Sequence, residues 1–136
     1  MGSYNKSVKD FKRRKYNDAN IYVDAVNLAK ICMDINKNLP KTYKVIYGEK
    51  LLGKLCDFTI EFPKVFNNND LNEKENGILR LKNMFDEVKY LIKYAIDINL
   101  SEFKKLSNAY CHCGVLDKQL DGWLNKVIEM KKIKKI

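Results

Sequence analysis

Apolar residues recur at alternating steps of three and four along most of this chain, and no other feature restricts its fold as strongly. Such steps return side chains to one side of an α-helix, so each run predicts a helix with one apolar stripe. No stretch shows the period of two that a half-buried strand requires. The sequence therefore predicts an all-α fold. The four runs are Ile21, Ala25, Leu28, Cys32, Ile35 and Leu39; Val45, Gly48, Leu52, Leu55, Thr59, Phe62 and Phe66; Ile78, Leu81, Phe85, Val88, Ile92 and Ala95; and Phe103, Leu106, Tyr110, Cys113, Leu116, Leu120, Trp123 and Val127.

Helix-breaking and capping residues separate these runs. Pro40 lies between the first two, where proline stops a helix. Asp70 precedes the third, and Glu73 three residues later predicts a capping box. Ser101 is expected to cap the fourth helix. Pro63, inside the second run, is expected to kink or end that helix.

The length of 136 residues suits one domain. Four helices joined by short loops predict an antiparallel four-helix bundle over residues 18–130, with a basic N-terminal arm (1–17) and a basic C-terminal tail (131–136). Several helices carry more apolar surface than one stripe needs. This favours self-association, although a tightly packed monomer with a few exposed apolar side chains remains an alternative.

The net charge of +9 is concentrated at the two ends of the chain. Residues 1–17 hold six basic residues and one acidic residue, residues 126–136 hold five and one, and the charges between them cancel. Basic arms on a neutral domain can hold phosphate backbones through counterion release, or they can simply keep a small protein in solution. The candidate nucleic-acid-binding residues at the ends are Lys12, Arg13, Arg14, Lys15, Lys131 and Lys132.

The only histidine, His112, stands between Cys111 and Cys113. Adjacent helical residues point about 100° apart, so this triplet does not close a tetrahedral metal site by itself. Cys113 lies on the core stripe, and we expect packing rather than a metal or redox centre. No phosphate-binding loop, dinucleotide motif or paired catalytic carboxylate stands out. The sequence therefore predicts no enzyme, no catalytic residue and no cofactor.

No apolar run approaches the ~18 residues that cross a bilayer, so no membrane partner is expected. The charged N-terminus does not read as a secretion signal, and four cysteines without one predict reduced thiols and a cytoplasmic location.

Three segments together resemble a known family. They are LPKTYKVIYGEKLLGKL (39–55), LRLKNMFDEVKYLIKYAIDINLSEFKKL (79–106) and VLDKQLDGWLNK (115–126). Their order and spacing are similar to those of the accessory variability determinant proteins of diversity-generating retroelements. These belong to the group of four-helix bundles that includes the 23S rRNA intervening-sequence proteins.

The resemblance implies a non-catalytic homopentameric barrel that binds RNA or cDNA and a reverse transcriptase, and so supports mutagenic cDNA synthesis. It also implies a binding role for Lys89 and Lys93 on the third helix, with Arg80 earlier on a related face. The alternative is an intervening-sequence-type bundle, a protein- or RNA-associated module without a retroelement.

Overall fold

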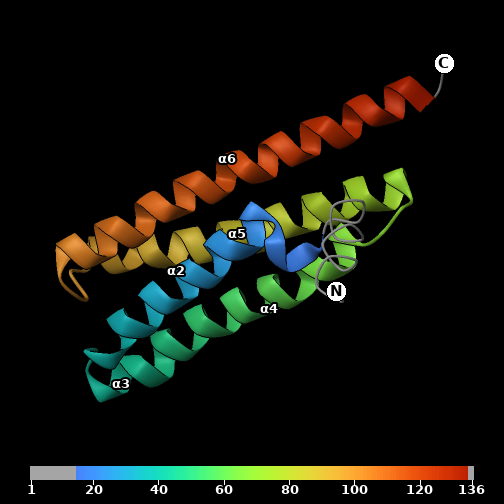
Figure 1. Cartoon of the computed structure of the whole chain (residues 1–136). Helices are drawn as coiled ribbons and strands as arrows, with labels where there is room; N and C mark the ends of the chain where they lie inside the picture. Colours follow the sequence, from blue (N-terminus) through green and yellow to red (C-terminus); the bar gives the residue numbers. More distant parts are fainter. Residues whose placement is uncertain (1–14, 135–136) are drawn as a thin grey trace, which may run out of the picture.

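The computed structural model describes residues 15–134, which are helical and contain no strand (Figure 1). The all-α prediction is confirmed for this part of the chain. The long helices are α2 (Asn20–Lys37), α4 (Glu49–Phe66), α5 (Leu71–Asp97) and α6 (Phe103–Lys134). The short elements are the 3₁₀ turn η1 (Tyr16–Asp18), α3 (Lys41–Tyr43) and the π-helical turn η2 (Lys44–Gly48), which runs on into α4.

The four long helices form a bundle in which α2 packs on α4 and α6, and α5 packs on the same two helices. Helices α2 and α5 are therefore diagonal to each other, as are α4 and α6. Short connections make each helix antiparallel to the next, as Figure 1 shows. An even number of antiparallel helices brings the start of α2 and the end of α6 toward the same end of the bundle.

The first and third apolar stripes are buried at every predicted position, but the second and fourth are partly wrong. In α4 the buried line is Leu51, Leu55, Phe58, Phe62 and Val65, whereas Val45 is 58% exposed. In α6, Leu106 and Ala109 are buried, whereas Phe103 is 68% exposed. Both segments are apolar on two neighbouring stripes, so spacing alone did not decide which stripe faces inward.

The π-helical turn η2 explains part of the shift in α4, because a five-residue turn changes the rotational register of the residues before it. Two hydrogen bonds hold this turn. Asn36 Nδ2 donates to the Gly48 carbonyl at 3.1 Å, and the Tyr47 hydroxyl donates to the Leu91 carbonyl at 2.6 Å. A Cβ at Gly48 would lie 3.0 Å from Asn36 Nδ2, so the close approach favours glycine.

The predicted cap of α5 is confirmed, with one change. Asp70 Oδ1 accepts a hydrogen bond from the Glu73 amide at 3.0 Å. The Glu73 carboxylate accepts from Asn68 Nδ2 at 2.8 Å, and Asn68 Oδ1 accepts from the Asp70 amide at 2.9 Å. Asn68 therefore takes the place of the direct return bond of a capping box.

Three predicted boundaries differ from the structure. Pro63 does not end α4, which continues to Phe66. Proline lacks an amide hydrogen, so the helix loses one backbone hydrogen bond close to its last turn, and the remaining turns are unaffected. The Glu102 carbonyl accepts the first α6 bond from the Leu106 amide at 3.1 Å, so Glu102 rather than Ser101 precedes the helix. Helix α6 continues to Lys134, so residues 131–134 belong to a helix rather than a tail.

The helices differ in length, and this shapes one end of the bundle. Helix α2 has 18 residues and α6 has 32, or about 27 Å against about 48 Å. The C-terminal part of α6 therefore extends beyond the start of α2, as Figure 1 shows.

Candidate nucleic-acid interface

Ion pairs engage about half of the basic residues in the middle of the described chain, and they bridge three of the four grooves between neighbouring helices. Lysine–carboxylate pairs of this kind contribute little stability at the surface, and each neutralises the charge of its own lysine. The pairs between helices are Lys54–Glu87 and Arg80–Glu61 across α4 and α5, Lys82–Asp121, Lys89–Asp117 and Lys131–Glu75 across α5 and α6, and Lys105–Asp34 across α2 and α6.

Lys89 lies in the groove between α5 and α6. Its Nζ donates to Asp117 Oδ2 at 2.6 Å and lies 3.7 Å from Asp86 Oδ1, and its side chain is 25% exposed. The hydrogen bond to Asp117 raises the pKa of Lys89. The structure thus places this predicted binding residue in an interhelical ion pair.

Lys93 is more open, and tyrosines flank it. Among the described residues its ion-pair partner is Asp97 on its own helix, at 2.5 Å, and half of its side chain is exposed. Tyr90 and Tyr94 are exposed on the same helix, and Tyr110 of α6 is close enough to contribute to the raised pKa of Lys93, behind the larger effect of Asp97. Our sequence reasoning missed these tyrosines, although the Lys-Tyr step at 89–90 recurs at 93–94.

Arg80 does not share a face with Lys89, which corrects the sequence interpretation. It lies 3.7 Å from Glu61 of α4, whereas Lys89 pairs with α6 on the other side of α5. Nine residues of helix amount to two and a half turns, so the two side chains point in opposite directions.

The unpaired positive charge of α6 gathers toward its end. Lys131 pairs with Glu75 at 2.9 Å, but within residues 15–134 Lys126, Lys132 and Lys134 have no ion-pair partner. Lys15, which is exposed, begins the described chain at the same end, where η1 packs on α2 and α4. Lys12, Arg13 and Arg14 lie outside the described residues and directly precede it. Chain topology therefore brings the starting points of both basic segments to one end of the bundle.

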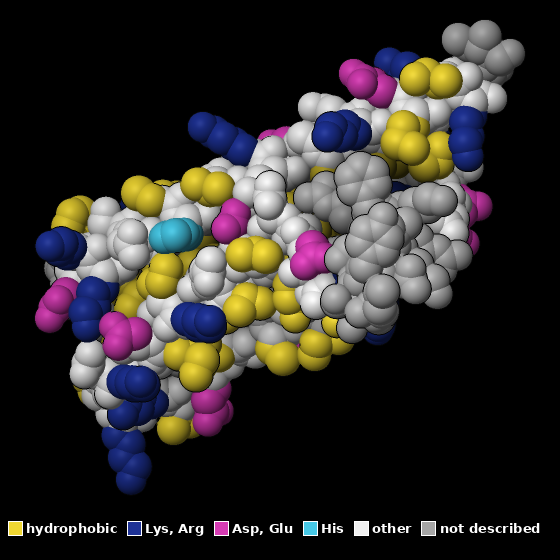
Figure 2. All heavy atoms as spheres, viewed as in Figure 1, with side chains coloured by type: hydrophobic (Ala, Val, Ile, Leu, Met, Phe, Trp, Pro, Cys, Tyr) yellow, Lys and Arg dark blue, Asp and Glu magenta, His cyan; other side chains and the backbone are white. Residues whose placement is uncertain are grey.

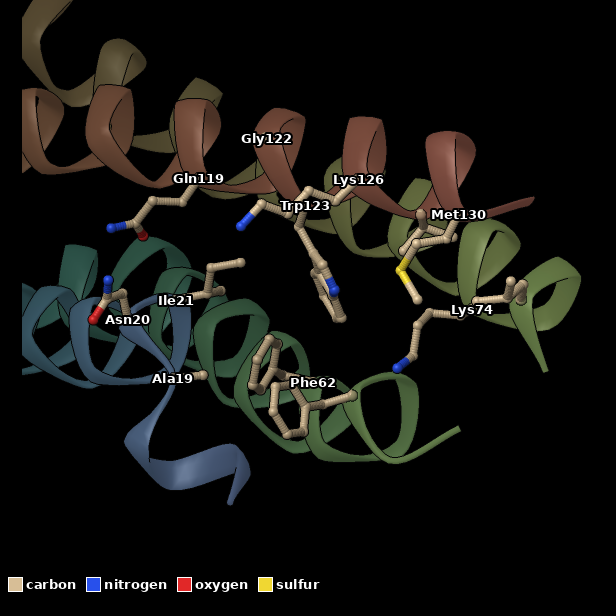
Figure 3. A pocket seen from close by; sticks show the side chains of 13 residues that line it. Ala19, Asn20, Ile21, Phe62, Lys74, Gln119, Gly122, Trp123, Lys126 and Met130 are labelled. Carbon is tan, nitrogen blue, oxygen red and sulfur yellow. The ribbon is translucent and has the colours of Figure 1, made fainter. Parts of the chain in front are cut away.

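An aromatic groove of about 440 Å³ opens at this end, between α6, the start of α2, the end of α4 and the start of α5. In Figure 3, Trp123 projects from α6 into the groove, Phe62 lies on the opposite wall, and Lys74 reaches in from α5. The rings of Phe62 and Trp123 are 5.3 Å apart, and Lys74 Nζ lies 5.9 Å from the Phe66 ring centre. Burial lowers the pKa of Lys74.

The outer face of α2 and α4 is largely apolar, with charged side chains such as Lys30 and Glu49 at its edges, and we call it the α2–α4 face. Among the described residues, no ion pair joins these two helices. Met33 and Ile60 are 51% and 58% exposed, and Cys56 is also exposed. Figure 2 shows hydrophobic side chains along both helices. The face consists of Tyr22, Val26, Ala29, Met33, Leu52, Cys56, Ile60 and Pro63.

The Cys111–His112–Cys113 triplet spreads over three environments. Cys111 is exposed, His112 is half-buried, and Cys113 is fully buried on the core stripe, as predicted. Burial raises the pKa of the Cys113 thiol to about 12, so this sulfur stays protonated at neutral pH. Within residues 15–134 no three His, Cys, Asp or Glu side chains gather closely enough to hold a metal ion.

Comparison of the chain with protein-family models, with curated proteins and with solved structures returned no match. None of the helices between residues 15 and 134 combines the length and the apolar character needed to span a membrane.

Proposed function

We propose that this chain is a non-catalytic accessory protein that binds nucleic acid, assembles with copies of itself and holds a template beside a reverse transcriptase. One observation supports the nucleic-acid part of the proposal. The two sequence segments that carry the excess positive charge, near the N-terminus and near the C-terminus, adjoin the bundle at the same end. Among residues 15–134, Lys126, Lys132 and Lys134 of α6 have no ion-pair partner there, and the sequence segment containing Lys12, Arg13 and Arg14 directly precedes Lys15, which lies at the same end. Phosphates attract such a surface without sequence readout.

The α2–α4 face supports self-association. An exposed, largely apolar face costs free energy in water, and a second copy can cover its apolar side chains. A ring such as the homopentamer needs two different patches on each subunit. The exposed aromatic side chains Tyr90, Tyr94 and Phe103, on α5 and at the start of α6, offer a second patch on the other side of the bundle.

The reverse-transcriptase partner follows from the resemblance of residues 39–55, 79–106 and 115–126 to accessory variability determinant proteins. Lys89 and Lys93, which the resemblance associates with binding, lie beside the second patch. Within this proposal Lys93 contacts a partner, because a surface pair such as Lys93–Asp97 exchanges easily with another anion.

Salt-dependent RNA binding tests the proposal. Anisotropy of a labelled single-stranded RNA, measured between about 50 and 200 mM salt, should show an affinity that falls steeply with salt. About five or six phosphate contacts from the terminal basic residues give a slope of log K against log salt near −4. Removing residues 1–14 should reduce that slope.

Two variants of α6 provide a matched pair. Lys132→Glu changes an unpaired lysine at the proposed binding end, and Lys104→Glu changes one at the opposite end. The first should weaken RNA binding several-fold, and the second should change it little. Equal effects, or a slope near zero, would reject the localised site and favour the alternative, an intervening-sequence-type interaction module.

A further inference from the structure

The groove lined by Phe62, Phe66 and Trp123 adjoins the basic end of α6 and shares Lys126 with it, but the charge argument does not use its aromatic rings. It lies where α2 is too short to cover α6, so that, within residues 15–134, no helix covers aromatic surface that a longer α2 would bury. Trp123 and Phe66 are each partly buried, and Phe62 is buried in the wall opposite Trp123. A volume of about 440 Å³ lies within the range of small-ligand pockets.

Two cations border these rings. Among the described residues, neither Lys74 nor Lys126 has an ion-pair partner, and Lys74 instead lies over the Phe66 ring. Aromatic rings bordered by unpaired lysines fit a ligand that has both a flat apolar part and a negative charge. Within single-stranded nucleic acid, a base supplies the first and its phosphate the second.

A third feature of the wall is a buried hydrogen-bond acceptor. Gln119 Nε2 donates to Asp24 Oδ2 at 2.7 Å, which leaves Gln119 Oε1 without a partner in the described chain. Orphaned buried acceptors are uncommon in folded proteins. An exocyclic base amine is a donor of the kind that this oxygen lacks.

We propose that the groove receives one unpaired base of a single-stranded RNA or DNA, stacked against Trp123 and Phe66, with its phosphate held by Lys74 and Lys126. This inference rests on the proposed function, because it assumes that the basic end of the bundle brings nucleic acid to the groove. It adds a preference for unpaired bases, which charge alone does not supply.

The single tryptophan of the chain makes the test direct, because all tryptophan emission reports on the groove. A single-stranded oligonucleotide should quench Trp123, whereas an abasic strand of equal length and charge should bind by anisotropy without quenching it. A duplex should also leave the emission unchanged. Quenching by the abasic strand, or binding of the single strand without quenching, would overturn the groove assignment and leave the proposed function standing.

Failure of every oligonucleotide to bind would reject both proposals. A blue shift with anionic phospholipid vesicles, together with no response to the single strand, would assign the groove to an acyl chain and overturn the base-pocket proposal.

Matched lysine variants extend the test. Lys126→Ala at the groove should weaken single-strand binding several-fold, because one phosphate contact is lost while the stacking rings stay in place. Lys118→Ala changes an exposed, unpaired lysine on the same helix and away from the groove, and should have little effect. Equal weakening by the two variants would contradict the proposed geometry.

Discussion

Lys89 provides the sharpest contrast between a binding role and a structural role. The resemblance assigns it to binding, but the structure places its ammonium between Asp117 at 2.6 Å and Asp86 at 3.7 Å. The substitution Lys89→Met keeps the length and apolar contacts of the side chain and removes only the charge. Asp117, whose side chain is 29% exposed, then loses its partner in the α5–α6 groove.

The magnitude follows from this geometry. A hydrogen bond to a charged group contributes ~1.5–3 kcal/mol when buried, and partial solvent exposure reduces this to about 1 kcal/mol. With a urea slope of ~1.5 kcal/mol per molar, the unfolding midpoint of Lys89→Met should fall by about 0.7 M. The matched control Lys93→Met removes an exposed pair and should leave the midpoint nearly unchanged. Far-ultraviolet circular dichroism measures both.

The pH dependence adds a second check. The pKa of Lys89 is raised in the folded state, so its stabilising contribution is complete below the unfolded pKa of about 10.4. That contribution is lost as the pH rises through the higher folded pKa. The difference between wild type and Lys89→Met should therefore shrink in strongly alkaline buffer. A variant as stable as wild type that binds RNA less well would refute the structural role.

Three further predictions concern thiols, packing and assembly. A thiol reagent at pH 8 should modify the exposed Cys56 and Cys111 in the native protein. Cys32 and Cys113 should react only after unfolding, because burial raises the pKa of each of these two thiols to about 12. Fast reaction of all four thiols would contradict the burial of Cys32 and Cys113. Gly77→Ala should destabilise the bundle by about 1–3 kcal/mol in urea unfolding, because the new Cβ would lie 2.8 Å from the Val65 methyl groups. A gain in stability would show that the packing of α4 against α5 is looser than described. Met33→Lys combined with Ile60→Lys should reduce the mass of the assembly in sedimentation and preserve its helicity. The control Val115→Lys, at an equally exposed site on α6, should leave that mass unchanged. A lower mass for Val115→Lys alone would place the interface away from the α2–α4 face.

Periodicity predicted the helices and most of the core, and it was most accurate in α2 and α5, where one regular three-four spacing marks the inward stripe. Every predicted position from Ile21 to Leu39 and from Ile78 to Ala95 is buried. In α4, Leu51 and Leu52 are both apolar, and the sequence does not reveal the π-helical turn at Lys44–Gly48 that sets the register. The inward stripe there depended on tertiary packing.

The candidate site was harder to predict, since charge patterns do not show which lysines find partners. Lys89 meets Asp117, 28 residues away, and Arg80 meets Glu61 on another helix. Trp123 was expected in the core, yet it is only partly buried, because within residues 15–134 the short α2 does not extend far enough to cover it. The exposure of Trp123 depends on the relative lengths of the helices, and the partners of Lys89 and Arg80 lie far away in the sequence, so neither could be predicted from local patterns.

Light scattering of the purified protein, alone and mixed with a single-stranded RNA at low and moderate salt, tests the central claim most directly. The account predicts a multimer of the 16.0 kDa chain, five copies for the ring, that carries RNA at low salt and releases it as salt rises. A monomer whose mass is the same with and without RNA at both salts would contradict it.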